Sequence, residues 1–481
     1  MVTVKEVEEF IQSFKNKKNM KKAKIYDVII YVMTLIVFLM QGFYVGLHHE
    51  PWADEAQAWL IADDSNSLLE IFKSTRYEGT PPLWHCIIKI AQLCGLTYDY
   101  FFILPLLFSM IGVILLFCSK APMMWKVIVP FTYFIAYQNT VVARSYSLVF
   151  PIMMMLVISL KKKNQVLYYI SLILLGLTSS YGIIISGSFL LYDLIYFTIN
   201  KKIERTKTNI LGFYITGAIL FLAGLTVLPP DDGFSLTMAK ERTITELFYD
   251  ITSTFFVPME CTFLYVSTAI VLIVFFIWYC KKDILRTCIC TIPLALYYIL
   301  AGDCIWHLTY FYLLIIVFLI LNENDSEKMS FKEGFILVMM IVQVFAGFYS
   351  SHADVQKKYC GAEKASRILK PYVEQGVEIA AADYFATAIA PYFSDNIFAN
   401  RPGTQRYYLW STESKYVDMH HKEYNSIQSL SQYSVIVAKK RTDTSLFSSL
   451  KGYRRYSCHG EMFYKFESFK PYDFFIFIKE N

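Results

Sequence analysis

Charged side chains are scarce in this sequence. Of its 481 residues, 18% are Asp, Glu, Lys or Arg, and 55% are hydrophobic. Soluble domains carry about a quarter charged residues, so the composition argues against an ordinary soluble protein and indicates a membrane protein. The net charge of +5 says less than the positions of the basic residues, which set the orientation of membrane helices.

Signatures of metal and nucleotide binding are also missing. The ten cysteines lie mostly in apolar runs, and the closest pair, Cys288 and Cys290, has the wrong spacing for a C-x-x-C site. The neighbouring His48 and His49 fit no zinc pattern, because adjacent side chains point apart on a regular backbone. No G-x-G-x-x-G follows an expected strand, and no Walker sequence occurs. The sequence therefore does not support a disulfide framework, a zinc site or nucleotide binding.

Long apolar runs dominate instead. Residues 1–24 are basic and lead into an apolar run at 25–47, which is too long for the core of a signal peptide and is not followed by a cleavage site. We expect an uncleaved first membrane helix with its basic end in the cytoplasm. Further runs bring the expected total to about eleven spans; they are residues 101–118, 122–139, 145–160, 166–179, 181–199, 209–228, 261–280, 284–301, 304–321 and 332–350.

The orientation of these spans depends on one shorter apolar segment, residues 83–96. It has about one half to two thirds of the roughly 20 residues that a membrane helix needs. If it does not cross the membrane, the later basic clusters fall in the cytoplasm, as the positive-inside rule requires. Those clusters are Lys120 with Lys126, residues 161–163, residues 201–207, and Lys281 with Lys282 and Arg286. We therefore expect a juxtamembrane helix at 83–96, inside a first outside loop of residues 48–100.

Three parts are expected along the chain. Residues 1–24 form a basic cytoplasmic N-terminus, residues 25–350 form an α-helical polytopic membrane domain, and residues 351–481 form a small α/β domain outside the membrane. In the last part, the patterns predict helices at 363–373 and 383–392, and strands within 377–383, 433–440, 453–468 and 471–481. The segment NRPGTQRYYLW at 400–410 is compatible with sugar or phosphate binding and equally with a structural loop.

The first outside loop is rich in carboxylates. Asp54 and Glu55 follow the first span closely, and Ala56, Trp59 and Leu60 then share one face at helical spacing, which predicts an amphipathic surface helix. Carboxylates are stable at such a helix start, so Asp54 has a structural interpretation as well as a catalytic one. A second carboxylate, Glu78, precedes Gly-Thr-Pro-Pro and the short helix. Both are expected at the membrane interface.

With these features, the sequence resembles the GT-C superfamily of integral-membrane glycosyltransferases. The closer resemblance is to the branch that includes protein mannosyltransferases and the aminoarabinose transferase acting on lipid A. It is carried by the Asp-Glu pair after the first span, E-G-x-P-P-L at 78–83, ARSYSL at 143–148, SSYG at 179–182 and WHLTYFY at 306–312. The chain departs from the pattern at Trp306, where many members have arginine, at Ser180, where many have histidine, and at Asp99, near a common arginine.

The resemblance implies an inverting single displacement. A sugar would pass from a polyprenyl-phosphate donor to a hydroxyl of a lipid, glycan or protein acceptor outside the cytoplasmic membrane, without cofactor or nucleic acid; a metal is not expected, since the closer branch generally uses none. Asp54 would be the base that takes the acceptor proton, and Glu78 would position donor or acceptor. The other implied substrate-binding residues are Glu55, which alternatively only orders the loop, Arg144 and His307 at the leaving phosphate, and Tyr146 and Tyr181 in the pocket.

Other cations and other functions remain open at this point. Arg76, Lys240 and Arg242 are alternatives to Arg144 for the phosphate. A transporter or lipid flippase would usually show internal repeats and ionisable residues at mid-membrane, and neither is evident. An acyltransferase would need a histidine in a chamber reached from the cytoplasm, whereas His307 is expected on the outer side. An envelope-assembly protein without transferase activity is a further alternative. The expected location is a bacterial cytoplasmic membrane.

Overall fold

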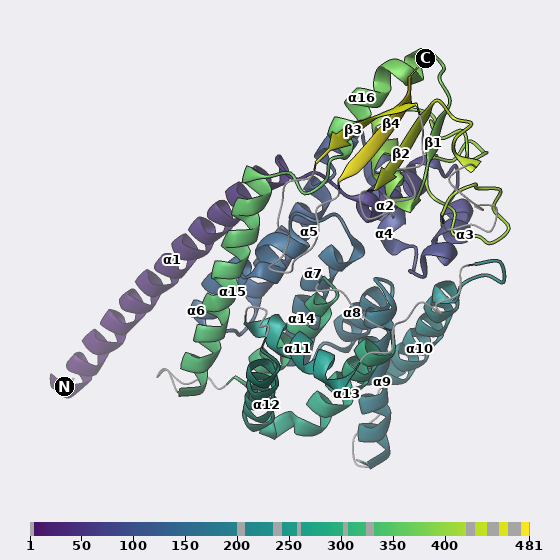
Figure 1. Cartoon of the computed structure of the whole chain (residues 1–481). Coiled ribbons are helices and arrows are strands. Elements are labelled where there is room, and N and C mark those ends of the chain that lie inside the picture. The colour runs from purple at the N-terminus through teal and green to yellow at the C-terminus, as the bar shows by residue number, and fades with distance from the viewer. Residues whose placement is uncertain are drawn as a thin grey trace.

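The computed structural model describes residues 4–199, 207–233, 243–256, 261–301, 306–323, 331–419, 429–439, 452–459 and 473–480, with side chains from residue 25 onward. The chain is mainly helical, with a small sheet close to its C-terminal end (Figure 1). The helices are α1 (Val4–Gly46), α2 (Ala53–Asp64), α3 (Leu68–Glu78), α4 (Leu83–Leu93), α5 (Ile103–Cys118), α6 (Met123–Ile128), α7 (Val149–Lys162), α8 (Gln165–Gly176), α9 (Ser180–Ile199), α10 (Lys207–Val227), α11 (Ile244–Phe255), α12 (Thr262–Tyr279), α13 (Ile284–Ala301), α14 (Leu308–Asn322), α15 (Phe331–Gln356) and α16 (Ala362–Glu374).

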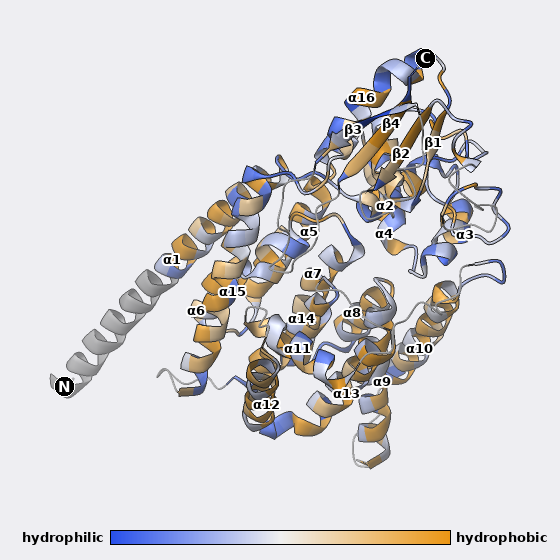
Figure 2. Cartoon of the chain, viewed as in Figure 1, coloured by the Kyte–Doolittle hydropathy of each residue, from blue (hydrophilic) through white to orange (hydrophobic). Residues whose placement is uncertain are grey.

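Eight helices in the described part of the chain are long and apolar enough to cross a membrane. Several of them turn large apolar side chains outward, among them Val32 on α1, Phe221 on α10 and Val274 on α12. Figure 2 shows orange, hydrophobic segments on the coloured parts of these helices. Exposing so much apolar surface to water is unfavourable at about 25 cal/mol per Å², so these faces suit a lipid environment.

The remaining apolar runs form shorter or interrupted helices. Helices α8 and α14 are apolar but shorter than these eight helices. The run 122–139 is not one helix, because it divides into α6, a 3₁₀ turn at Val129–Phe131 and a π-helix at Phe134–Asn139. Pro130 lies at the break, where its missing N–H and fixed ring prevent a continuous helix. The count of eleven spans therefore stays a prediction.

The segment expected to be a juxtamembrane helix is short in the structure as well. Helix α4 covers Leu83–Leu93 and has only 11 residues. At about 1.5 Å per residue, this length is roughly half of the hydrocarbon thickness. In Figure 1, α2, α3 and α4 lie together at the end of the helical bundle that also holds the sheet.

The C-terminal unit, from α16 to the last strand, contains a four-stranded sheet. Its strands are β1 (Ile379–Ala381), β2 (Val435–Lys439), β3 (Tyr453–Cys458) and β4 (Phe474–Lys479), in the order β1-β2-β4-β3. Strands β1 and β2 are parallel, and β4 is antiparallel to both of its neighbours. Each strand lies inside a stretch that the alternation predicted. The segment expected as a helix at 383–392 is a 3₁₀ helix, Tyr384–Tyr392.

Helix α2 differs from its expected surroundings. It is not an amphipathic surface helix, because residues on all of its faces are buried, including Ala53, Glu55, Gln57 and Ile61. It packs on α4 on one side and on the 3₁₀ helix of the C-terminal unit on the other. The helix is therefore internal to the protein.

Candidate functional site

At the start of helix α2, the carboxylate of Asp54 lies beside the guanidinium of Arg144. An Oδ2 atom of Asp54 lies 3.4 Å from Nη1 of Arg144, and both side chains keep partial exposure, 30% and 25% respectively. The hydroxyl of Tyr384, from the C-terminal unit, donates a hydrogen bond of 3.0 Å to Oδ1 of Asp54. Asp54 is thus held by a cation from the membrane part and a phenol from the C-terminal unit.

The second predicted carboxylate, Glu78, lies close to this pair. It is the last residue of α3, which ends because Gly79 takes a left-handed conformation (φ 62°) that glycine adopts without strain. Its Oε1 accepts a hydrogen bond of 2.8 Å from Gln57, one turn after Asp54 on α2. Burial raises the pKa of Glu78 to about 7 and Asp54 adds to this, while the Gln57 hydrogen bond and the charge of Arg144 oppose it. Asp54, Glu78 and Arg144 therefore form one electrostatic group.

Glu55 faces away from that group and is fully buried. Its carboxylate accepts backbone hydrogen bonds from Trp52 (3.3 Å) and from Ala143 (2.7 Å), and it lies 3.1 Å from Nε2 of His49. The Ala143 contact fixes the turn that immediately precedes Arg144. These contacts assign Glu55 an ordering role in the loop, which the sequence had left as one of two interpretations.

Tyr181 and His307 form a second cluster. The Tyr181 hydroxyl lies 3.2 Å from Nδ1 of His307, and their ring centroids are 4.8 Å apart. Tyr181 also stacks on Tyr310 at 5.5 Å, and Arg144 acts electrostatically on Tyr310. This cluster therefore adjoins the Asp54 group.

A tryptophan pair gives a further link between the two clusters. Trp306 packs on Trp52, the residue before α2, with ring centroids 6.2 Å apart. Tyr146 is buried near Arg144 and both members of the Asp54–Glu55 pair. It is 3% exposed, so its role is in packing around Arg144 rather than on an open surface.

The structure adds a buried charged cluster that the sequence did not indicate. His49 lies between two carboxylates, with Nδ1 2.8 Å from Asp354 at the end of α15 and Nε2 3.1 Å from Glu55. The Tyr137 hydroxyl donates to the same Asp354 oxygen at 2.9 Å. Burial alone lowers the pKa of His49, but the two carboxylates outweigh it and raise the pKa to about 10. His49 is therefore a cation at neutral pH.

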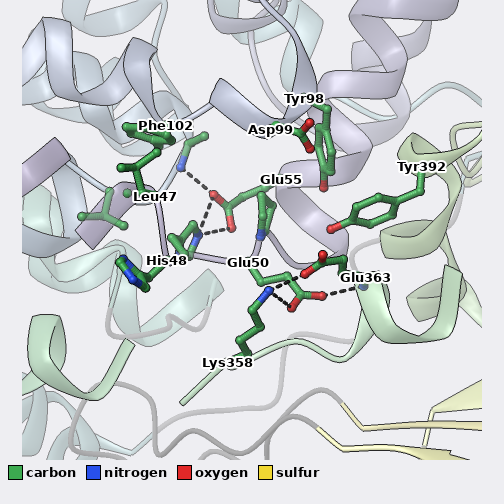
Figure 3. A pocket seen from close by; sticks show the side chains of 15 residues that line it. Leu47, His48, Glu50, Glu55, Tyr98, Asp99, Phe102, Lys358, Glu363 and Tyr392 are labelled. Carbon is green, nitrogen blue, oxygen red and sulfur yellow. Dashed lines mark hydrogen bonds and ion pairs between the residues drawn. The ribbon is translucent and has the colours of Figure 1, made fainter. Parts of the chain in front are cut away.

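A cavity of about 200 Å³ lies on the Glu55 side of α2 (Figure 3). Lys358 is 3.7 Å from Glu50 and also pairs with Glu363, whose backbone N–H donates to Glu50 at 2.6 Å. Burial raises the pKa of Glu50 to about 7, although the hydrogen bond from the Glu363 N–H and the charge of Lys358 both act to lower it. Asp99 and Glu55 add two further carboxylates to the lining. Lys358 and His49 are the cations of this lining, and the four acidic residues outnumber them.

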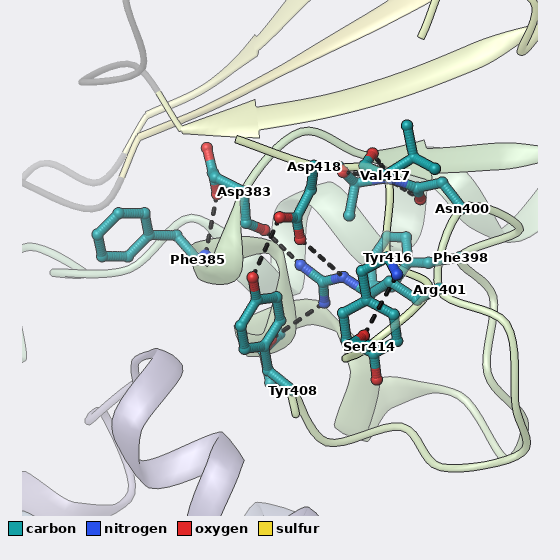
Figure 4. Close-up of polar contacts among 12 residues, drawn as sticks. Asp383, Phe385, Phe398, Asn400, Arg401, Tyr408, Ser414, Tyr416, Val417 and Asp418 are labelled. Carbon is teal, nitrogen blue, oxygen red and sulfur yellow. Dashed lines mark hydrogen bonds and ion pairs between the residues drawn. The ribbon is translucent and has the colours of Figure 1, made fainter. Parts of the chain in front are cut away.

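The segment 400–410 turns out to be largely a structural loop (Figure 4). Arg401 is 2% exposed and donates to the Thr387 hydroxyl at 3.2 Å and to the Asp383 carbonyl. Its guanidinium lies 4.7 Å from the ring centre of Tyr408, whose hydroxyl donates to Asp418 at 3.1 Å. Arg401 thus organises the loop from inside instead of reaching a ligand.

Arg406, from the same loop, ties the C-terminal unit to the far end of α2. Its guanidinium donates to Asp64 at 2.8 Å and 2.6 Å and pairs with Asp63. The carbonyl of Phe393 accepts a further hydrogen bond of 2.9 Å. Both arginines of the segment are therefore used in holding the fold.

Among the alternative cations, Arg76 lies away from the Asp54–Arg144 pair. Arg76 lines a separate acidic cavity of about 390 Å³ together with Asp231, Asp232 and Glu413. Lys240 and Arg242, like most of the turn 302–307, lie outside the described residues. Within the described ranges, no cluster of three His, Cys, Asp or Glu side chains is arranged to hold a metal ion.

Comparison of the chain with protein-family models, with curated proteins and with solved structures finds no match.

Proposed function

We propose that the chain is a membrane glycosyltransferase that moves a sugar from a polyprenyl-phosphate donor to an acceptor hydroxyl at the outer face of the membrane. The observation that carries this proposal is the meeting of Asp54, Glu78 and Arg144 at one end of an apolar helical bundle. Two carboxylates and one cation, partly open to solvent, are the groups that proton removal and phosphate departure require.

The displacement would run in one step. The acceptor oxygen bonds to the anomeric carbon as the bond from that carbon to the phosphate oxygen breaks, and polyprenyl phosphate leaves with the electron pair. The acceptor proton passes to a carboxylate. Arg144, 25% exposed, offers the positive charge that stabilises the leaving phosphate. The Tyr181–His307 cluster beside it would line the donor side.

The geometry favours Glu78 over Asp54 as the proton acceptor, the reverse of the assignment made from the resemblance. Asp54 meets Arg144 through Oδ2 and Tyr384 through Oδ1, so both of its oxygens already have partners. Glu78 accepts from Gln57 through one oxygen, and its pKa of about 7 is suited to a base that works near neutral pH. Asp54 would instead hold Arg144 in place.

A transfer assay in proteoliposomes tests this proposal. Purified protein is incubated with a radiolabelled polyprenyl-phosphate sugar and an extract containing lipid and glycan acceptors, from pH 5 to pH 9. We expect sugar transfer whose rate rises with pH through about 7, as Glu78 loses its proton. The charges of Arg144 and Asp54 act on Glu78, whereas the nearby Tyr407 phenol, whose pKa is raised by burial, stays neutral over this range. Absence of transfer with every polyprenyl-phosphate sugar tried would rule the proposed activity out.

The proposal requires a particular orientation, with α2 to α4 and the C-terminal unit outside. Cysteine placed at Lys162, at the end of α7, should be inaccessible to a membrane-impermeant maleimide in whole cells, whereas cysteine at Lys358, 55% exposed, should be labelled. The background has the exposed Cys94, Cys118 and Cys261 replaced by serine. Labelling of position 162 from outside would reverse the topology and with it the outer-face reaction.

A further inference from the structure

The side-chain amide of Gln57 links helix α2 to the C-terminal unit. The backbone N–H of Tyr408 donates to Oε1 of Gln57 at 2.8 Å, and Nε2 of Gln57 donates back to the Tyr408 carbonyl at 2.7 Å. The same nitrogen donates to Glu78 at 2.8 Å. An amide group has two N–H donors, so Gln57 gives one to the C-terminal unit and one to the carboxylate.

The C-terminal unit also makes a hydrogen bond to Asp54, the other carboxylate of the site. Tyr384 donates its hydroxyl to Asp54, and its ring is fixed between Trp410, at 4.8 Å, and Tyr408, at 5.4 Å. Tyr384 is 7% exposed, so it is a packed residue with one polar atom directed at Asp54. Both carboxylates of the site are therefore reached, directly or through Gln57, by one loop region more than 300 residues away.

From these contacts we propose that docking of the C-terminal unit onto α2 assembles the active site, with Gln57 and Tyr384 as positioning residues for Glu78 and Asp54. The inference rests on the proposed transferase function and assigns a role to the C-terminal unit within it. Without docking, the Gln57 amide loses its two backbone partners on Tyr408 and can rotate away from Glu78. Asp54 loses the Tyr384 hydroxyl, which donates to the carboxylate oxygen that does not face Arg144.

Other contacts between the C-terminal unit and the helices α2 and α3 do not involve Asp54 or Glu78. Arg406 holds the far end of α2 through Asp63 and Asp64. Tyr407, next to Tyr408, places its hydroxyl 3.1 Å from that of Ser74 on α3. Replacing Tyr384 with Phe thus removes one contact to Asp54. Replacing Gln57 with Met removes the contact to Glu78 together with two bonds to the Tyr408 backbone, while the Arg406 and Tyr407 contacts still hold the unit on α2 and α3.

The test compares Gln57→Met and Tyr384→Phe with Tyr407→Phe as the matched control, all in the full chain in proteoliposomes. Tyr384→Phe keeps the ring and should lower kcat about tenfold with KM unchanged. Gln57→Met should move the acid limb of the kcat–pH profile upward by about one pH unit, because the lost hydrogen bond stabilised charged Glu78. Tyr407→Phe removes one hydroxyl of the same interface and should change neither kcat nor the profile.

A spectroscopic readout separates failure of this inference from failure of the proposed function. The infrared carboxylic-acid band of Glu78, identified by its loss in Glu78→Gln, can be titrated without any substrate. Its midpoint should rise in Gln57→Met and stay unchanged in Tyr407→Phe, whether or not transfer is found. Equal midpoints in Gln57→Met and the wild type, or equal kcat values in Tyr384→Phe and Tyr407→Phe, would overturn the inference.

Discussion

Replacing Glu78 with Gln is expected to lower the rate of sugar transfer by roughly 10²- to 10⁴-fold, the usual contribution of a general base. The amide is nearly isosteric with the carboxyl and can still accept from Gln57, which bonds only one oxygen of Glu78 at 2.8 Å. What is lost is the capacity to accept the acceptor proton. Because Gln carries no charge, the variant should also lose the rise in rate near pH 7.

The control for this variant is Glu70→Gln. Glu70 is in the first turn of the same helix, α3, is exposed, and accepts a hydrogen bond of 2.6 Å from the backbone N–H of the neighbouring Asn66. The Glu70→Gln variant should transfer sugar at the wild-type rate. Single-turnover measurement with prebound donor then isolates the chemical step. Glu78→Gln turnover within threefold of wild type would remove Glu78 from the reaction and leave Asp54 as the candidate base.

The loop after the first span was predictable because its chemistry is local. Asp54, Glu78 and the short helix that follows lie within about forty residues of each other, and charge patterning predicts that the loop faces outside. Arg144 could be predicted as a site residue only through the ARSYSL motif at 143–148, which is also a short stretch of sequence. The structure brings these three residues together. The expected membrane-protein composition likewise reflects single-residue properties summed along helices.

Contacts between distant parts of the chain were not predictable from this sequence. Gln57 meets Tyr408 across 351 positions, and His49 meets Asp354 across 305. Neither pair belongs to a recognisable motif, and no periodicity in the sequence indicates the partner of Gln57 on its helix or of His49 in its loop. The α2 expectation failed for the same reason, since burial of its polar face is produced by the C-terminal unit. Only the break at Pro130 had a local signal, the proline itself.

Replacing His49 with Gln is expected to destabilise the protein by about 3–5 kcal/mol, as the loss of one partner from a buried ionic cluster does. The His49 side chain is 2% exposed, and both of its carboxylate partners, Glu55 and Asp354, are completely buried. Without the imidazolium, two buried carboxylates share the space with no counter-charge. Because Glu55 also anchors the Ala143 N–H before Arg144, the change should reduce transfer as well. The fall in Tm is measured by thermal unfolding in detergent.

The cluster of His49, Glu55 and Asp354 also predicts how the stability of the protein changes at high pH. The pKa of His49 is raised from 6.5 to about 10 in the folded protein, so its stabilisation is complete below about pH 6.5 and is lost progressively as pH rises through about 10. The Tm of the wild type should therefore fall steeply between pH 8 and pH 10, whereas that of His49→Gln should depend much less on pH over this range. The double variant His49→Gln/Asp354→Asn removes one carboxylate and should recover part of the lost Tm. A His49→Gln Tm equal to that of the wild type at pH 7, or parallel pH curves for the two proteins, would show that the imidazolium does not stabilise the junction between the first loop and α15.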